Sequence, residues 1–535
     1  MTFRRGRRAF WRLSAGAGLW LVLGAATGAR ADTDCATRIA EVIAGIAARD
    51  LDTARGPPLN AFLALNPYAV TEASERDRRV AAGASPGALD CVPVAVKDNY
   101  ATFDMPMTVG SLSLVGNQPP RDAAIVARLR AAGAIVVGKT NMDEFAFGIS
   151  GVSGAGGRVG NAYDPARSSG GSSAGSGVAV GAGFVPLAVG SDNCGSLRIP
   201  AVYNGVVALR PTYGRFDSEG LFPIGFANSA PGLIARDIPM LAAGLAAIDP
   251  GWRPAQAAAP ASLRGMRFGV LAAVGDAALG PTNTDAGMLL LRAVALLRSA
   301  GAEIVEGIRL EGFDATLGRR FVAGSAPRID AVLSAYPAAR RDWADVCSSG
   351  RIPPDWTASE CLSMMAADRV GEAVAQSQIA ANRSLIEAVL ATKRLDGLVY
   401  LTDRRGSAGA DQSDGYTCFV ASTSGLPAIA LPAGLDTAGM PVGIEILGGF
   451  GRDEALVAVA AALERSRGPL TEPPPVPWSA RLAGLGIAGQ NGLRLFIGWS
   501  AFKSRYGDAL GDLAAERFRA LTEQVVGRWT SLAPP

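Results

Sequence analysis

The chain of 535 residues contains no histidine. Histidine is the usual general base near neutral pH and the commonest nitrogen ligand of catalytic metals. Its absence excludes Ser-His-Asp and Cys-His catalysis, together with every metal site that needs an imidazole. Hydrolytic chemistry in this protein must therefore use another base. We expect neither a metal ion nor a cofactor.

Lysine is almost as scarce as histidine. Only four of the 51 Lys and Arg residues are lysines, namely Lys97, Lys139, Lys393 and Lys503. Lys97 follows the apolar run 92–96, so burial is expected to lower the pKa of its ammonium group and to provide a neutral amine as a base. Arginine could not serve this purpose. The alternative is a structural lysine at a strand end, paired with Asp98.

Apolar runs long enough to span a bilayer are also missing, and a shorter apolar stretch lies near the N-terminus. A basic stretch at residues 4–12 precedes an apolar stretch at 13–27 and a small-x-small sequence at 29–31. This order predicts a signal peptide over residues 1–31 and a periplasmic or secreted mature protein without a stable membrane span. The alternative is an uncleaved anchor, but about 15 apolar residues fall short of the ~20 that span a bilayer. Residues 7–10 loosely match a twin-arginine export pattern.

The formal net charge of +3 does not indicate a nucleic-acid partner. Six arginines and no acidic residue lie within residues 1–31, so the rest of the chain carries a formal charge of −3. Because no basic run occurs elsewhere, we expect no nucleic-acid partner. The oligomeric state stays open.

Six cysteines are present, and none forms a CxxC pair, so neither a redox motif nor a zinc ribbon is indicated. Export would permit disulfides. Cys347 with Cys361 would close a short loop, and Cys35 with Cys91 a longer one. The alternative of six reduced and mostly buried thiols stays open.

Helical and strand patterns alternate along the chain. An amphipathic helix, a glycine that ends it and a buried strand follow one another over residues 123–137, and this order recurs over 288–305 and 385–400. The alternation predicts an α/β fold with a mixed or parallel sheet covered by helices. The remaining local predictions are a helical pattern over 36–79, a strand over 93–96, a proline-rich connector over 473–477 and a helical C-terminal extension over 478–535.

Residues 133–140 match the Walker A pattern letter for letter. A phosphate-binding loop must be open, whereas residues 134–137 form an apolar, β-branched run that suits the middle of a sheet. The expected strand therefore lies inside the pattern and does not precede it. We do not predict a nucleotide site there.

Two Gly/Ser-rich segments, 168–176 and 190–200, flank a compact helix and an apolar strand over 178–189. Such segments are most often flexible linkers, but linkers do not usually bracket core elements. Glycines beside a serine permit tight turns, and successive N–H groups in such a turn can form an oxyanion hole. A serine activated by a lysine is a known substitute for the missing histidine.

The order of these motifs resembles the amidase signature family. The similar segments are 94–99, 138–145, 170–176, 192–200, 209–214, 425–429 and 439–443. The resemblance implies a large mixed, mostly parallel twisted sheet covered by helices, within one amidase domain at 32–477. It is weakest over 255–413, the region expected to face the substrate.

The resemblance also implies a Ser-Ser-Lys triad. Ser196 would be the nucleophile, Ser172 the bridging serine after a cis peptide bond, and Lys97 the base that drives the proton relay. The remaining implied site residues are the oxyanion donors Asn193, Cys194, Gly195 and Ser196, and the loop supports Asp192, Arg198, Gly171 and Ser173.

Three positions depart from the family pattern. Cys194 stands where glycine or alanine is common, and its side chain should be tolerated if its φ is negative, with a thiol that narrows the acyl pocket. Arg210 replaces a lysine and Ser422 replaces an asparagine, and both are expected to affect the shape of the substrate site.

The leading hypothesis is an exported amidohydrolase that cleaves a carboxylic amide C–N bond in a small molecule or a peptide. A second is a transamidation protein similar to the A subunit of glutamyl-tRNA amidotransferase, because residues 138–145 are close to that branch. The predicted signal peptide argues against it, since that role needs cytoplasmic partners. A third is a non-catalytic binding protein on the same fold.

Overall fold

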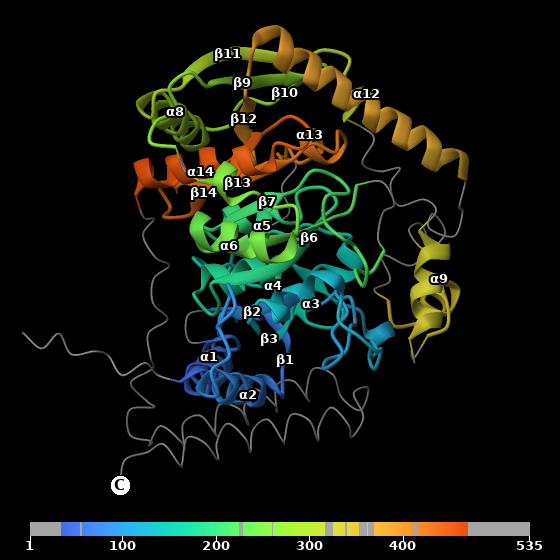
Figure 1. The fold of residues 1–535 in the computed structure, drawn as a ribbon. Helices are drawn as coiled ribbons and strands as arrows, with labels where there is room; N and C mark the ends of the chain where they lie inside the picture. The colour runs from blue at the N-terminus through green and yellow to red at the C-terminus, as the bar shows by residue number, and fades with distance from the viewer. Residues whose placement is uncertain are drawn as a thin grey trace, which may run out of the picture. The chain divides into compact units, whose positions relative to one another are not determined.

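Twelve strands form one sheet in this computed structural model (Figure 1). The structure describes residues 34–53, 56–223, 228–258, 260–315, 325–336, 340–352, 361, 369–407, 409 and 415–468. The predicted signal peptide, proline-rich connector and C-terminal extension lie outside these residues. The described residues from Cys35 onward belong to one compact unit.

The strand order of the large sheet is β1-β3-β2-β6-β8-β7-β13-β14-β12-β9-β10, and β11 also pairs with β9. Its strands are β1 (Phe62–Leu65), β2 (Pro93–Lys97), β3 (Ile135–Thr140), β6 (Leu187–Asp192), β7 (Val207–Arg210), β8 (Ala230–Ala235), β9 (Arg267–Val274), β10 (Ala277–Ala278), β11 (Glu303–Leu310), β12 (Gly397–Leu401), β13 (Ala428–Leu435) and β14 (Pro441–Leu447). A separate small sheet contains β4 (Val152–Ser153) and β5 (Gly157–Arg158).

Helices cover the sheet. They are α1 (Cys35–Arg49), α2 (Ala69–Ala81), α3 (Ala124–Ala131), α4 (Ala174–Gly181), α5 (Arg198–Tyr203), α6 (Ile238–Ile248), α7 (Pro254–Ala257), α8 (Thr284–Ser299), α9 (Ala326–Ala335), α10 (Trp343–Cys347), α12 (Arg369–Lys393), α13 (Phe419–Ser422) and α14 (Asp453–Arg467). Among the described residues, no helix is long and apolar enough to cross a membrane.

The predicted mixed sheet is confirmed, but its parallel part is smaller than expected. Of its described strand pairs, β2 runs parallel to β3 and β6, and β9 runs parallel to β11 and β12. The other pairs, including every pair from β6 through β8, β7 and β13 to β14, are antiparallel. The parallel strands belong to crossover units with helices, such as β2-α3-β3, whereas the short β13–β14 connection permits only an antiparallel pair.

The helix–glycine–strand prediction holds for α3 and β3 and for α8 and β11. Gly133 and Gly301, which lie just after the two helices, have φ values of +96° and +104°. In the third unit the prediction of a terminating glycine is wrong, because Arg394 directly follows α12 with a φ of +52° and Gly397 is the first residue of β12. Glycine adopts this left-handed conformation without strain, which explains why it ends two of the three helices.

The prediction of a continuous helical pattern over 36–79 is wrong in its middle. Two helices, α1 and α2, flank β1, which pairs antiparallel with β3 at the edge of the sheet. In this pairing, Phe62 of β1 lies opposite Thr140 of β3, more than 70 residues further along the chain. Local periodicity could not indicate a partner at that distance.

Side chains on alternating strand positions divide the core into two layers. Val94 and Val96 pack with α3 and α6 on one face, whereas Ala95 packs with α1 and α4 on the other. This alternation follows from the pleat of a strand, whose successive side chains point to opposite faces. Burial on both faces requires the continuous apolar runs that the sequence has at β2 and β3.

The structure has three disulfides. Cys35–Cys91 and Cys347–Cys361 confirm the two proposed pairs, and Cys194–Cys418 is a third that the sequence did not indicate. No cysteine of the described residues is free, so the alternative of six reduced thiols is wrong for this structure.

Candidate active site

Lys97 is the last residue of β2 and is completely buried. Its Nζ lies 2.7 Å from Ser172 Oγ and 2.9 Å from Ser191 Oγ. Ser191 is close because β6 runs parallel to β2, so the carboxyl ends of both strands reach the same edge of the sheet. Ser191 also accepts a hydrogen bond from Asn99 Nδ2 at 3.0 Å. The amine of Lys97 thus has two hydroxyl groups as its hydrogen-bond partners.

The environment of Lys97 favours its neutral form. Burial lowers the pKa of Lys97 to about 7, and the more distant charges of Asp143 and Asp192 oppose that shift. The alternative of a structural Lys97–Asp98 pair is wrong, because Asp98 forms its ion pair with Lys139 at 3.1 Å. A lysine with this pKa can exchange a proton near neutral pH.

Ser172 lies in the loop before α4, and the Gly171–Ser172 peptide bond is cis, as the resemblance implied. Its carbonyl oxygen accepts a hydrogen bond from the N–H of Asp143 at 3.2 Å. The carboxylate of Asp143 lies against Gly171, where an added Cβ would come within 1.9 Å of Oδ2. Gly171 is therefore required for this packing, which supports its predicted role in shaping the loop.

Ser196 lies between β6 and α5 and is 3% exposed. Its carbonyl oxygen accepts a hydrogen bond from the N–H of Ser173 at 3.1 Å, and Ser173 Oγ donates to the carbonyl oxygen of Ser191 at 3.1 Å. The structure thus brings the two Gly/Ser segments together, as the Ser-Ser-Lys triad implied by the resemblance requires. In this part of the chain, no hydrogen bond joins the Oγ atoms of Ser172 and Ser196.

The backbone N–H groups on either side of Ser196 differ in whether they have an acceptor. Gly195 donates its N–H to Asp192 Oδ1 at 2.9 Å, and Leu197 donates to Asp192 Oδ2 at 3.2 Å. Within the described residues, the N–H groups of Cys194 and Ser196 have no acceptor. Gly195 has a φ of +83°, whereas Cys194 is not among the described non-glycine residues with positive φ, so the condition for its side chain is met.

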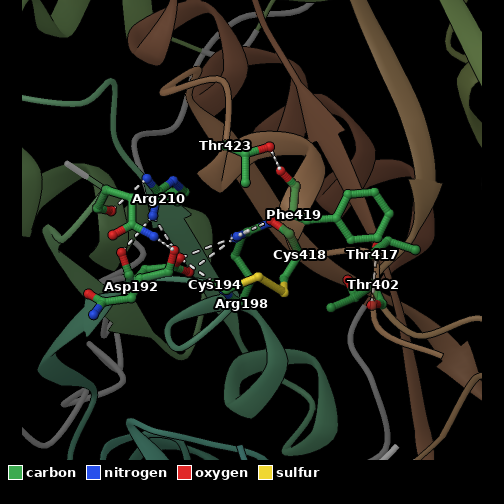
Figure 2. Close-up of a disulfide and its surroundings, with 12 residues drawn as sticks. Asp192, Cys194, Arg198, Arg210, Thr402, Thr417, Cys418, Phe419 and Thr423 are labelled. Atoms are coloured by element: carbon green, nitrogen blue, oxygen red, sulfur yellow. Dashed lines mark hydrogen bonds and ion pairs between the residues drawn. A yellow bond between two sulfur atoms is a disulfide. The ribbon is translucent and has the colours of Figure 1, made fainter. Parts of the chain in front are cut away.

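A buried group of charges holds this loop (Figure 2). Arg198 Nε lies 3.1 Å from Asp192 Oδ2, and Arg210 Nη1 lies 2.8 Å from Asp192 Oδ1. Arg198 also forms an ion pair with Glu445 of β14. All four side chains are fully buried, and the two arginines hold the pKa of Asp192 below its usual range despite the opposing effect of its burial. The predicted roles of Asp192 and Arg198 in loop support fit this arrangement.

Arg210 does more than was expected from its substitution for lysine. In addition to its ion pair, Nη1 donates to the carbonyl oxygen of Asp192 at 2.6 Å and Nη2 donates to that of Asn228 at 2.8 Å. Asn228 Nδ2 in turn donates to the carbonyl oxygen of Asn193 at 2.8 Å. The forked guanidinium therefore holds the start of the loop, directly at Asp192 and through Asn228 at Asn193, in a geometry that the single ammonium of a lysine does not provide.

Cys194 does not carry the thiol that was expected to narrow the acyl pocket. Its sulfur is bonded to Cys418, which directly precedes α13 (Figure 2). Arg198 Nη2 also donates to the carbonyl oxygen of Cys418 at 3.1 Å. The loop is therefore joined to α13 both covalently and through a buried arginine.

Four residues of the site were given no role from the sequence: Ser191, Asp143, Glu445 and Cys418. Ser191 and Asp143 lie inside the motif segments, so their positions were a usable signal. Glu445 stands alone as a charge in the apolar strand Pro441–Leu447, which could have indicated a buried ion pair. Cys418 had no local signal. Within the described ranges, no group of three or more Cys, Asp and Glu side chains is arranged to hold a metal ion.

Known proteins are similar in sequence over most of this chain. The profile of the family described as Amidase matches residues 52–311. The chain is 33% identical over 443 residues to the A subunit of the glutamyl-tRNA(Gln) amidotransferase of Rhodopirellula baltica, covering 73% of this chain and 86% of that protein. It is also 33% identical over 448 residues to the mandelamide hydrolase of Pseudomonas putida, covering 77% and 86%, respectively.

Solved structures agree with the sequence comparison. The native peptide amidase from Stenotrophomonas maltophilia matches with a TM-score of 0.73 and 32% identity over 83% of this chain and 95% of that one. A peptide amidase in complex with the competitive inhibitor chymostatin matches with a TM-score of 0.72. Together with the buried lysine and the cis serine, these similarities show that the chain belongs to the amidase signature family and is a hydrolase that acts on amide C–N bonds.

Proposed function

We propose that this protein is an exported amidase that cleaves its substrate through an acyl-enzyme on Ser196, with Ser172 and Lys97 as the proton relay. The observation that carries the proposal is the 2.7 Å contact between Lys97 Nζ and Ser172 Oγ. Because burial lowers the pKa of Lys97 to about 7, a substantial neutral fraction can accept a proton near neutral pH.

The relay moves one proton along each link. Neutral Lys97 takes the hydroxyl proton of Ser172, which takes the proton of Ser196 as Ser196 Oγ attacks the amide carbonyl carbon. When the C–N bond breaks, the relay runs backward and protonates the departing amine. Water then attacks the acyl-enzyme in the same way, which releases the acid and restores Ser196. The hydrogen bond between the two serines forms with substrate in place, as active-site contacts commonly tighten in the bound state.

The loop Asn193–Ser196 provides the oxyanion hole. The N–H groups of Cys194 and Ser196 have no acceptor among the described residues, so they are available for the oxygen that becomes negative in the tetrahedral intermediate. The N–H of Gly195 is engaged by Asp192 in the resting enzyme, and we assign it the support of the loop as well as its implied place in the hole.

The substrate is proposed to be a small-molecule or peptide amide, with no nucleic-acid partner. Similar proteins include a peptide amidase and a mandelamide hydrolase, and peptide amides and mandelamide are therefore the first compounds to screen. Selectivity is assigned to the divergent region 255–413. Export to the periplasm or the medium is supported by the sequence of residues 1–31 and by the three disulfides, which persist in oxidising compartments.

A second candidate function is transamidation, because the Rhodopirellula amidotransferase protein is as similar in sequence as the mandelamide hydrolase. That role takes place in the cytoplasm, where thiols are kept reduced. Fractionation of the native producer distinguishes the two. Recovery of the full-length chain from the cytoplasm with residues 1–31 attached would favour transamidation over export.

The test is labelling with a fluorophosphonate followed by peptide mapping. Attack by Ser196 forms an O–P bond and expels fluoride, so the expected result is a single adduct on Ser196. The adduct should be lost in Ser196→Ala and strongly reduced in Lys97→Ala, whereas Ser172→Ala should lose less. Failure of the folded wild type to label would instead support a non-catalytic binding protein.

A further inference from the structure

We propose that the Cys194–Cys418 disulfide is a positioning element for catalysis, which holds the Cys194 N–H in the direction of the oxyanion, so that opening the disulfide slows the chemical step. This inference rests on the proposed function of the Ser196 loop. It assigns a role to a bond that joins residues 224 positions apart in the sequence.

One end of the disulfide lies within the catalytic loop itself. Cys194 is two residues before Ser196, and its own N–H has no acceptor among the residues described. The next N–H, that of Gly195, is fixed by Asp192 Oδ1 at 2.9 Å. Asp192 therefore fixes the peptide group after Cys194, and the disulfide fixes the side chain of Cys194. Together they restrict the rotation that would turn the Cys194 N–H away from the substrate.

The other end of the disulfide is held by the sheet. Thr417, the residue before Cys418, donates its Oγ1 to the carbonyl oxygen of Leu401 at 2.6 Å, and its N–H to that of Thr402 at 3.2 Å. The carbonyl oxygen of Cys418 accepts from Arg198 at 3.1 Å (Figure 2). Cys418 is thus anchored to the end of β12 and to the buried charges that support the loop.

The loop also packs directly on Cys418. A Cβ added to Gly195 would lie 2.8 Å from Cys418 Cβ and 2.5 Å from Ile199 Cδ1, which is closer than real Cβ atoms approach other atoms. Only a glycine permits the loop to sit this close to Cys418. If the disulfide were open, two thiols would occupy this space at a longer sulfur–sulfur distance, and the loop would have to move outward.

Misplacement of a single donor is costly for catalysis. Displacing a reacting group by about 1 Å can reduce the rate by about a hundredfold, and removing one oxyanion donor costs about 10²- to 10³-fold. No hydrogen bond among the described residues joins Cys194 or Cys418 to Lys97 or Ser172, so the proton relay should be unaffected. The expected signature is a slower chemical step with unchanged binding and an unchanged pH dependence.

The experiment compares two double variants, Cys194→Ala/Cys418→Ala and, as the matched control, Cys35→Ala/Cys91→Ala. The Cys35–Cys91 disulfide joins α1 to the segment before β2 and lies outside the catalytic loop. The readout is fluorophosphonate labelling of Ser196, because the phosphonyl oxygen occupies the same position as the oxyanion. Labelling is measured at several probe concentrations and at pH 6 to 9.

The expected result is a maximal labelling rate that falls roughly ten- to a hundredfold in Cys194→Ala/Cys418→Ala, with half-saturation and pH midpoint as in the wild type. The control should keep the wild-type rate. Equal maximal rates in the two variants would overturn the proposal. So would a change only in the probe concentration that gives half-maximal labelling. If the wild type itself is not labelled at Ser196, it is the proposed function that fails.

A second measurement covers the case in which the double variant does not fold. The wild-type protein is treated with a water-soluble phosphine, which is oxidised to its phosphine oxide with oxygen from water as each disulfide becomes two thiols. Mass mapping reports which disulfides are open. The labelling rate should fall in step with the opening of Cys194–Cys418 and return when the phosphine is removed and oxidised glutathione, which is itself reduced to two thiols, closes the disulfide again. Full activity with this disulfide open would again overturn the proposal.

Discussion

Two buried lysines on neighbouring strands have different partners. Lys97 ends β2 and Lys139 lies on β3, where it is paired with Val96 in the register of the sheet. Because side chains alternate along a strand, the two amines lie on opposite faces. Lys139 forms an ion pair with Asp98 at 3.1 Å and donates to the carbonyl oxygens of Tyr100 and Pro106. Lys97 has hydroxyl partners and, among the described residues, no carboxylate within ion-pair distance.

This difference shows that burial alone does not make a base. Burial lowers the pKa of both lysines, but the carboxylate of Asp98 acts against that effect at Lys139. An ammonium that is paired with a buried carboxylate is kept as a charge and stabilises the fold. An amine between hydroxyls can lose its proton and accept another, which suits a catalytic relay. The pair also explains why residues 133–140 match a phosphate-binding motif without an open loop, since Lys139 lies within a strand.

The largest expected effect separates the two lysines by activity. Lys97→Met should lower kcat by at least about 10³-fold, because a member of a cooperating catalytic unit is removed. The variant should unfold at a temperature no lower than the wild type, since no charge is left without a partner. The measurement is steady-state turnover of an amide substrate together with thermal unfolding. An equal loss of kcat in folded Lys139→Met would remove the distinction between the two sites.

The second expected effect separates them by stability. Lys139→Met leaves Asp98 buried without its counter-ion, which should reduce the free energy of unfolding by about 3–5 kcal/mol. Adding Asp98→Asn to Lys139→Met should recover part of this loss, because the unpaired charge is removed. Urea denaturation measures both variants. If Lys139→Met is as stable as the wild type, Lys139 and Asp98 do not form the ion pair described here.

The pH dependence of activity gives a third and smaller effect. Only neutral Lys97 can accept a proton, so kcat/KM should fall about tenfold for each pH unit below about 7 and level off above pH 8. A pH-independent kcat/KM between about pH 5 and 9 would contradict lysine as the base. The Lys139 site predicts no such step, because Lys139 has no place in the proposed relay.

The lowered pKa of Lys97 also makes the free energy of unfolding depend on pH. The pKa of Lys97 is about 7 in the folded protein and near the ordinary 10.5 in the unfolded chain. Between these values the unfolded chain binds more protons, so the Lys97 contribution to the free energy of unfolding should rise with pH. Lys97→Met should lack this increase. A stability difference between wild type and variant that does not change from pH 7 to 10 would count against the shifted pKa.

The sequence was sufficient to predict the catalytic residues, but not the distant residues that hold the catalytic loop. Lys97 could be predicted from an apolar strand that ends in a lysine, and Ser172 and Ser196 from their resemblance to a family. Glu445 and Cys418 could not, because they lie 247 residues from Arg198 and 224 residues from Cys194, the residues they contact. Only the antiparallel centre of the sheet brings β14 and α13 to that loop.

The fold, too, has parts that the sequence predicts and parts that it does not. Units made of a helix, a turn and the following strand were predictable, because their apolar periodicity and their terminating glycines are local. The edge strand β1 and the antiparallel pairs of β13 depend on partners far away in the sequence. Local patterns therefore predicted the elements and the mixed sheet better than the directions in which the strands pair.

The smallest expected effect concerns Asp143. Its carboxylate accepts hydrogen bonds from the N–H of Gly151 at 2.9 Å and of Ser150 at 3.1 Å, and its charge raises the pKa of Lys97 against the larger effect of burial. Asp143→Asn keeps an acceptor for these N–H groups and removes the charge. The rise of kcat/KM should therefore move to lower pH, which at pH 6 increases the fraction of maximal activity by roughly twofold.

The adjacent carboxylate provides the matched control for this last comparison. Glu144 accepts a hydrogen bond from the N–H of Gly154 at 2.9 Å and is not among the charges that shift the pKa of Lys97. Glu144→Gln should therefore leave the pH midpoint unchanged, while Asp143→Asn lowers it. If both variants keep the wild-type midpoint, the charge of Asp143 does not reach Lys97, and the hydroxyl partners with burial account for its pKa alone.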